Sequence, residues 1–253
     1  MIEIILIGSG NLGCYFLDKL YSNEKLKLKG LYTRKKSFDC PKNIKLYKSI
    51  NEIEKADLYI IAVSDKSIIE ISKSLKVNSG CVVHTSGSIE MNVLNKFKNH
   101  GVIYPVQTIS KKNKLNNDSF PFLIESNNSS SRKIIEDILN ISKANYHYFS
   151  SEKRLITHLG AVISNNFVNH LNYFSKKILE EHNIDFNILK PLIKETTHKI
   201  NKYNPIDVQT GPAIRNDIST IKKHQKLLSN SNFIETYNII SNSILKLYRD
   251  EKL

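Results

Sequence analysis

The sequence predicts an α/β protein with a doubly wound, mostly parallel Rossmann sheet, followed by an all-helical C-terminal domain. Strand and helix patterns alternate over the first 150 residues, which is typical of a parallel sheet with helices on both faces. The segment 58–63 (LYIIAV) is apolar throughout, as expected of a strand buried on both faces. No strand pattern follows residue 150. We therefore expect two domains, 1–150 and 151–253.

Each expected strand is a short run rich in β-branched, aromatic or leucine side chains. The expected strands cover residues 3–7, 28–32, 45–47, 58–63, 81–84, 102–104, 122–125 and 146–149. Helical patterns cover residues 12–20, 67–75, 91–98 and 131–142. In the last of these patterns, Ile134, Ile135, Ile138 and Leu139 form one apolar stripe, which indicates an amphipathic helix.

The second half of the chain reads as helices only. Ser150 or Ser151 can cap a helix, and the pattern then continues to about Glu181. Further helices are expected at 185–202, with Pro191 near the start, at 219–228 and at 233–249. The expected helix that runs from about Ser150 to Glu181 is too long to pack only on a domain of this size. We therefore expect it also to pack on a second subunit.

The first strand leads directly into a glycine-rich turn, Gly8-Ser9-Gly10-Asn11-Leu12-Gly13, which opens a helix. This strand–turn–helix context is what makes the G-x-G-x-x-G pattern a dinucleotide-binding signal. Gly8 permits the tight turn, Gly10 lets the backbone approach a pyrophosphate, and Gly13 lets the helix pack close to the strand. The N–H groups and dipole of the helix N-terminus favour phosphate. All six residues are expected to contact the cofactor.

The end of the second strand indicates which dinucleotide is bound. An NAD site usually has an Asp or Glu there, about 20 residues after the glycines. This chain has Thr33 and Arg34, followed by Lys35 and Lys36. A hydroxyl and a guanidinium suit a 2′-phosphate. We therefore expect NADP(H), with Thr33 and Arg34 as contacts; the alternative is a solvated basic turn in a lysine-rich protein.

Composition narrows the function classes. The chain has 37 Lys+Arg against 24 Asp+Glu, a net charge of +13, and such a balance is common in nucleic-acid binders. Its lysines are spread along the whole chain, however, so we expect no nucleic-acid partner and attribute part of the charge to an anionic cofactor and substrate. No apolar stretch approaches the about 20 residues of a membrane span. Three scattered cysteines and no visible leader favour a cytoplasmic protein that is not membrane-bound.

Metal chemistry is not expected. The chain has no H-E-x-x-H motif, no paired Cys-His spacing and no EF-hand loop.

Ligands of open α/β sheets bind beyond the carboxyl ends of the strands, and three loops qualify. Val63 and Ser64, after the fourth strand, are expected to line the nicotinamide ribose. Thr85 and Ser86, in the loop 84–88 (HTSGS), are expected to approach nicotinamide and substrate; the loop also reads as a capped helix start. In the loop 104–108 (YPVQT), Gln and Thr either bind a substrate carboxylate or satisfy loop backbone.

The first long helix carries an unusual polar stripe. Counted at 3.6 residues per turn, one face holds His158, Val162, Asn165, Asn166 and Asn169. His158 is a candidate general acid that protonates a substrate oxygen or nitrogen after hydride transfer, and Asn166 is a candidate contact for the substrate's polar group. The competing interpretation is a solvated or interface-facing stripe.

A dense polar patch, 209–217 (QTGPAIRND), interrupts the helical region. Arg215 is a candidate bidentate clamp for a substrate carboxylate. Asp217 either orients that clamp or caps the helix that begins near residue 219. A purely structural turn is the alternative for the whole patch.

Together, the motifs at 8–13, 84–88, 104–108, 165–170 (NNFVNH) and 209–217 resemble a family of bacterial NADP oxidoreductases. These proteins join a Rossmann-like N-terminal domain to a helical C-terminal domain of uncharacterised function. The wider group is similar to pyrroline-5-carboxylate reductase, ketopantoate reductase and the 6-phosphogluconate dehydrogenase-like enzymes. The resemblance, which covers almost the whole chain, implies a homodimer formed through the helical domain, and a substrate that binds between the domains.

One departure from these relatives concerns the proton donor. Many β-hydroxyacid dehydrogenases have a catalytic lysine four residues before an asparagine on this helix, where the present chain has Ala161 or Val162. His158, or Lys153 at the helix start, is left as the candidate donor.

The sequence therefore predicts an NADPH-dependent oxidoreductase that reduces a small anionic 2-oxo acid or cyclic imine, of the ketopantoate or pyrroline-carboxylate kind. The proposed catalytic residues are His158, Asn166 and Arg215. The alternative is a non-catalytic dinucleotide-binding protein that acts as a sensor or scaffold.

Overall fold

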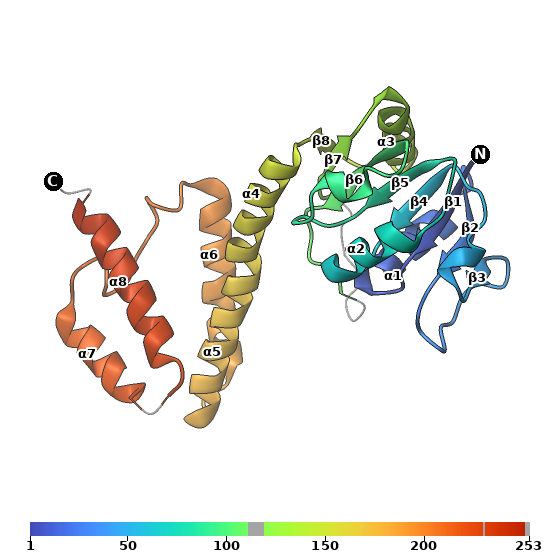
Figure 1. The fold of residues 1–253 in the computed structure, drawn as a ribbon. Coiled ribbons are helices and arrows are strands. Elements are labelled where there is room, and N and C mark those ends of the chain that lie inside the picture. The colour runs from blue at the N-terminus through green and yellow to red at the C-terminus, as the bar shows by residue number, and fades with distance from the viewer. Residues whose placement is uncertain (111–118, 230, 251–253) are drawn as a thin grey trace. The chain divides into compact units, whose positions relative to one another are not determined.

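The computed structural model describes residues 1–110, 119–229 and 231–250, which form two compact units, Met1–Asn165 and Asn166–Leu253 (Figure 1). Helix α4 (Ser151–Ala161) groups with the first unit by its contacts, although it lies beyond the domain boundary expected at residue 150. The boundary at residue 150 stays a prediction about where the cofactor-binding domain ends and the substrate-binding domain begins.

The first unit contains an eight-stranded sheet in the order β3-β2-β1-β4-β5-β6-β7-β8. All pairs are parallel except β6 with β7, which confirms the predicted mostly parallel, doubly wound sheet. The strands are β1 (Ile2–Ile7), β2 (Leu26–Tyr32), β3 (Lys45–Tyr47), β4 (Leu58–Ile61), β5 (Cys81–His84), β6 (Asn99–Pro105), β7 (Phe122–Ser126) and β8 (Tyr146–Tyr148).

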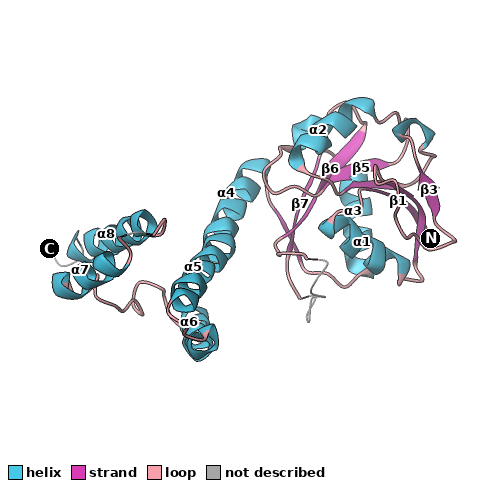
Figure 2. Cartoon of the chain, turned by 90° about the horizontal axis from the view of Figure 1, so that it is seen from below, coloured by secondary structure: helices cyan, strands magenta, loops and turns pink. Residues whose placement is uncertain are grey.

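Alternation along the strands divides the core into two layers. In β1, Ile4 and Leu6 point to the layer that contains α1 (Asn11–Tyr21) and α3 (Ser129–Ile141). Ile5 and Ile7 point to the opposite layer, which contains α2 (Asp65–Ser74). Figure 2 shows α1 and α2 on opposite sides of the strands. Both faces of the central strands are therefore buried, which explains their uninterrupted apolar sequence.

One expected helix is wrong. The segment predicted as helical at 91–98 forms only a single 3-10 turn, η2 (Met91–Leu94). No side chain caps its first turn, and β6 already begins at Asn99, so the chain has no room for further turns. A second 3-10 turn, η1 (Ile50–Glu52), precedes β4 and is stabilised by a capping box between Ser49 and Glu52.

Helix α4 is followed by a π-helical segment, η3 (Val162–Phe167), and then by α5 (Val168–Glu181). The stripe expected from His158 to Asn169 assumed 3.6 residues per turn throughout. The i→i+5 bonding of the π segment departs from that spacing. Within the first unit, Asn165 and His158 still contact the same 104–108 loop, at Thr108 and Tyr104.

The second unit is helical, as predicted. It contains α5, the 3-10 turn η4 (Phe186–Leu189), α6 (Lys190–Lys202), α7 (Ile218–Leu227) and α8 (Ile234–Asp250). Pro191 lies in the first turn of α6, where a missing N–H costs nothing. Side chains of α5, α7 and α8 surround an apolar pocket of about 360 Å³. No helix in the described part of the chain has the length and apolarity needed to cross a membrane.

Candidate active site

The glycine turn between β1 and α1 has the geometry expected of the motif. Gly8 has φ +118°, and a Cβ there would lie 2.2 Å from the carbonyl oxygen of Ala62. A Cβ on Gly13 would lie 2.2 Å from the carbonyl oxygen of Gly8. Larger residues would therefore separate the helix from the strand. By contrast, a Cβ on Gly10 would meet nothing within 4 Å, so this position faces open space.

A depression of about 320 Å³ lies beside this turn. It is lined by three segments that come from the ends of β1, β2 and β4, namely residues 8–10, 32–35 and 62–64, together with Ile71. No side chain caps the first turn of α1, so the N–H groups there, at exposed Asn11 and half-buried Leu12, keep no local partner. The predicted residues Val63 and Ser64 belong to this depression, and Ser64 also begins α2.

Ser9 and Thr33 connect two walls of the depression. Their hydroxyl oxygens are 2.6 Å apart, and the Thr33 hydroxyl also accepts a hydrogen bond from the N–H of Lys35. Both side chains are buried. The Thr33 hydroxyl is thus engaged inside the protein, where it holds the glycine turn against the end of β2.

Two cationic side chains lie at the rim of the depression. Arg34 donates a 2.8 Å hydrogen bond to the Ser67 hydroxyl and lies 3.6 Å from the Glu70 carboxylate, while most of its side chain stays exposed. The ammonium of Lys35 donates to the carbonyl oxygen of Ser9 at 3.2 Å. The positive charge that a ligand in the depression meets therefore comes from the side chains of Arg34 and Lys35.

The loop after β5 is shaped from within by a buried histidine. The N–H of Ser86 donates to Nδ1 of His84, so the neutral ring carries its proton on Nε2, which faces the carbonyl of Glu90 at 3.3 Å. Burial, with the charge of Arg154, lowers the pKa of His84 to about 4. His84 is therefore a neutral structural group at physiological pH.

The hydroxyls of the same loop also have internal partners. Thr85 donates to the carbonyl of Ile61 at 3.2 Å, and the Ser86 oxygen accepts from the N–H groups of Ser88 and Ile89. The capped helix start that we considered for this loop is wrong, because the next helical turn, η2, begins only at Met91 and no side chain caps it. Thr85 and Ser86 shape the loop, and their contact with a ligand stays a prediction.

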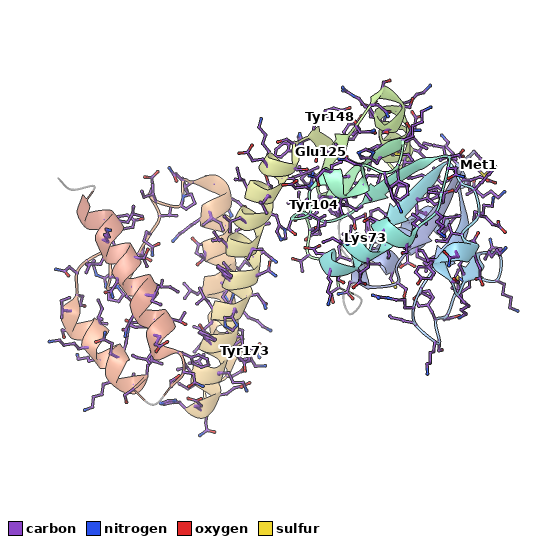
Figure 3. All side chains as sticks on the ribbon, viewed as in Figure 1. Met1, Lys73, Tyr104, Glu125, Tyr148 and Tyr173 are labelled. Atoms are coloured by element: carbon purple, nitrogen blue, oxygen red, sulfur yellow. The ribbon has the colours of Figure 1, made fainter. Side chains whose placement is uncertain are left out.

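His158 of α4 contacts this loop and Tyr104 at the end of β6, and we call this place the corner. Tyr104 was not among the predicted site residues. Nδ1 of His158 lies 3.0 Å from the hydroxyl of Tyr104, at the end of β6. A Cβ on Gly87 would lie 2.8 Å from Nδ1 of His158 and 2.9 Å from Cζ of Tyr104. Figure 3 shows Tyr104 near the start of α4. Its position in the YPVQT loop was the available signal, but we assigned the ligand contacts there to Gln and Thr.

A buried ion pair fixes α4 at this corner. Arg154 is 1% exposed and pairs with Glu125 of β7, whose side chain is labelled in Figure 3. Arg154 also donates to the carbonyl of Ile89 at 2.6 Å, and Ser151 donates to Glu125 at 2.7 Å. Because Arg154 lies one helical turn before His158, this network sets the position and rotation of the histidine.

The remaining predicted polar residues near the corner have modest roles. Asn165 donates to the hydroxyl of Thr108, and the side chain of Gln107 accepts from the N–H of Thr108. Lys153 is exposed in the first turn of α4, and its N–H donates to the capping hydroxyl of Ser150. Of the two candidate donors, His158 is the one that faces the sheet.

Asn166 and Arg215 lie in the second unit, and both are exposed. Asp217 caps α7, because its carboxylate accepts from the N–H of Thr220 at 3.0 Å; that hydrogen bond lowers the pKa of Asp217. The patch also contains two residues with positive φ, Gly211 at 116° and Asn216 at 54°. Part of this patch is therefore a structural turn, and Arg215 keeps a solvent-facing guanidinium.

The fold and the glycine turn define a Rossmann-type protein with a helical C-terminal region. Comparison with known families finds a match to the domain of unknown function DUF2520 over residues 120–244. No curated protein matches the chain.

Among solved structures, a putative NADP oxidoreductase from Bacteroides fragilis is 30% identical, with a TM-score of 0.87, over 97% of this chain and 98% of that one. The protein therefore belongs to the family of the DUF2520 domain and this oxidoreductase, which confirms the resemblance expected from its motifs.

Two more distant structures share the fold. A protein from Thermotoga maritima is 22% identical, with a TM-score of 0.71, over 99% of this chain and 100% of that one. The pyrroline carboxylate reductase of Plasmodium falciparum, solved with NADP bound, is 15% identical, with a TM-score of 0.61, over 96% of this chain and 98% of that one.

Proposed function

We propose that this protein is an NADPH-dependent oxidoreductase that reduces a small anionic 2-oxo acid or a cyclic imine. The observation that carries the proposal is the depression beside the glycine turn, which joins an uncapped helix N-terminus to the cations of Arg34 and Lys35. The name of the Bacteroides fragilis relative supports both the cofactor and the class of reaction.

The residues present fit a phosphorylated dinucleotide. The open space over Gly10 leaves room for a pyrophosphate against the N–H groups of α1. Arg34 supplies a guanidinium for the 2′-phosphate, which would take over the contact that Arg34 now makes with Glu70, and no carboxylate is among the residues that line the depression. When bound, the nicotinamide supplies a hydride; the protein supplies binding, orientation and a proton.

The proposed proton source is His158, which lies at the carboxyl end of the parallel strands beside the β5 loop. The proposed substrate contacts are Asn166 and Arg215, whose amide and guanidinium match the polar and carboxylate groups of an anionic substrate. The alternative proton donor, Lys153, has no contact with the β5 loop or β6 among the described interactions.

We also propose a homodimer formed through the helical region. Large apolar side chains on α4, α6 and α8, such as Leu159, Leu192 and Ile239, are more than half exposed in the single chain. Large apolar side chains that gather on a protein surface commonly mark a protein interface. The second copy of the chain is the proposed partner.

Cofactor preference tests the proposal most directly. We expect Arg34→Glu to weaken NADPH binding roughly 10- to 100-fold, since a hydrogen bond to a charged group contributes about 1.5–3 kcal/mol, and to change NADH binding far less. Titration of nicotinamide fluorescence measures both affinities. Lys73→Glu, an equal charge change at an exposed site on α2, is the matched control and should leave both affinities nearly unchanged. An equal loss for both coenzymes in Arg34→Glu would refute the 2′-phosphate contact.

Turnover decides between an enzyme and a sensor. NADPH oxidation is followed with ketopantoate, pyrroline-5-carboxylate and related keto acids and imines as substrates. An oxidoreductase consumes NADPH with at least one of them. Tight NADPH binding without consumption by any member of the panel would favour the non-catalytic function instead.

A further inference from the structure

Tyr104 and His158 form a hydrogen-bonded pair at the corner, and the proposed function assigns a role only to His158. Nδ1 of His158 lies 3.0 Å from the hydroxyl oxygen of Tyr104, and the two rings meet edge to face, with centroids 5.8 Å apart. Both side chains are half-buried. One ring nitrogen of His158 is therefore engaged by Tyr104 and is not free for direct contact with a substrate.

Gly87 brings the backbone of the β5 loop against both rings at once. A Cβ at this position would come within 3 Å of Nδ1 and Cγ of His158 and of Cζ of Tyr104. The loop that follows β5 thus packs against both rings, one of which comes from β6 and the other from α4. Because β5 and β6 are parallel neighbours, the hydroxyl of Tyr104 lies at the sheet edge where ligands of such folds bind.

A phenol has the right chemistry for a group that stands between an imidazole and a substrate. Its oxygen can accept a hydrogen bond from Nδ1–H while its own O–H donates a hydrogen bond to a second group. Burial raises the pKa of Tyr104, so the phenolate is unfavourable there. The hydroxyl can give up its proton only if another proton replaces it in the same event, and His158 is the adjacent source.

We propose that Tyr104 hands the proton to the substrate and that His158 replaces it. As the carbon of the substrate's C=O or C=N bond accepts a hydride, its oxygen or nitrogen takes the phenolic proton. The O–H bond of Tyr104 breaks, and a new one forms as Nδ1–H of the imidazolium breaks. The substrate gains two electrons and two hydrogens, NADPH becomes NADP⁺, and His158 ends neutral, to be recharged from water. This inference rests on the proposed function.

The pair is first tested without cofactor or substrate. Nitrogen-15 NMR of the imidazole rings reports which nitrogen carries the proton, with His158→Gln used to assign the signal. In the neutral ring, we expect the Tyr104 hydroxyl to donate to Nδ1 and hold the proton on Nε2. Tyr104→Phe should move the Nδ1 resonance, whereas Tyr21→Phe, an exposed tyrosine on α1, should not. An unchanged resonance in Tyr104→Phe would show that the contact is absent in solution and would overturn the inference.

Turnover then distinguishes the donor from its supplier. Tyr104→Phe should lower kcat about 10²-fold or more, the usual contribution of a general acid, with KM and NADPH affinity nearly unchanged. His158→Gln should lower kcat less, roughly 10-fold, because water can still replace the proton that Tyr104 gives up, although more slowly than His158 does. Thermal unfolding of each variant checks that the fold is intact.

The reverse order of effects identifies a different donor. If Tyr104→Phe keeps most of the turnover while His158→Gln loses it, His158 donates directly and the inference is wrong, although the oxidoreductase stands. If the wild type neither binds NADPH nor consumes it, the proposed function fails, and the relay fails with it.

Discussion

The two compact units of this protein are stabilised in different ways. Among the described residues, every buried hydrophobic side chain lies within residues 1–165, except Ala213 and Leu228. The second unit exposes large apolar side chains, such as Leu192 at 62% and Ile239 at 69%, and in the first unit α4 does the same at Leu159. The first unit therefore contains its own core, whereas the second needs a covering surface to bury its apolar faces. The proposed chemistry has its cofactor depression and its proton donors on the self-sufficient unit.

The largest effect is expected at the ion pair that holds α4 on the sheet. Arg154→Ala removes a buried guanidinium and leaves the half-buried Glu125 carboxylate without its cationic partner, which costs about 3 kcal/mol of unfolding free energy. Chemical denaturation measures the loss. Lys176→Ala, which removes an exposed i,i+4 pair with Glu180, is the control and should cost about 0.5 kcal/mol or less. A small loss in Arg154→Ala would mean that α4 is only loosely attached to the first unit.

Isoleucine truncations compare the two units directly. Ile60→Ala in β4, at a fully buried site, should cost about 2–5 kcal/mol. Ile239→Ala in α8 should change the stability of the single chain by about 0.5 kcal/mol or less. The same denaturation experiment, at low protein concentration, measures both. Similar losses at the two sites would show that α8 has a core of its own and would remove the contrast.

Leu192→Glu extends this comparison to the proposed dimer. Sedimentation at several concentrations should show a weaker dimer, by roughly tenfold or more if Leu192 is an interface hot spot, with little change in helix content. An unchanged association constant would exclude α6 from the interface.

Acid should weaken the first unit through His84. The folded protein protonates this ring only near pH 4, whereas the unfolded chain does so near its ordinary value of 6.5. The unfolded state therefore binds more protons between these values, and stability is full above about pH 6.5 and falls toward pH 4, by on the order of 3 kcal/mol. Denaturation midpoints measured across this range should fall less steeply in His84→Gln. His147→Gln, at an exposed histidine on β8, is the control and should keep the wild-type slope.

The sequence was sufficient to predict the sheet because its strands are apolar on both faces. Every expected strand is present, with bounds that differ by at most three residues from those observed, as at β6. The helix expected at 91–98 was wrong because apolar spacing does not reveal that β6 starts too soon to leave room for it. The π segment η3 was not predictable either, since nothing in the spacing of 162–167 differs from an ordinary helix.

The candidate site was only partly predictable, for reasons of distance along the chain. The glycine turn and Arg34 could be predicted as neighbours because the motif is local, and both line the depression, while their contact with a cofactor stays a prediction. Tyr104 and His158 are 54 positions apart, so their contact depends on the packing of α4. Arg154 resembles any basic residue near a helix start until its partner on β7 is known. The Thr33 hydroxyl also contacts that of Ser9, which a sequence does not show, and its contact with a phosphate stays a prediction.

The single antiparallel pair among the described strands, β6 with β7, has a consequence for tolerance to insertions. Because β7 reverses direction and β8 follows it, α4 starts beside Glu125, opposite Val102 of β6, and advances to Tyr104 two residues further along that strand. One added residue between Ser151 and His158 would turn the imidazole by about 100° and shift it by about 1.5 Å, away from the phenol. Insertions and deletions among relatives should therefore avoid residues 151–158. They should instead concentrate after His158, where the π segment η3 already interrupts the regular helix.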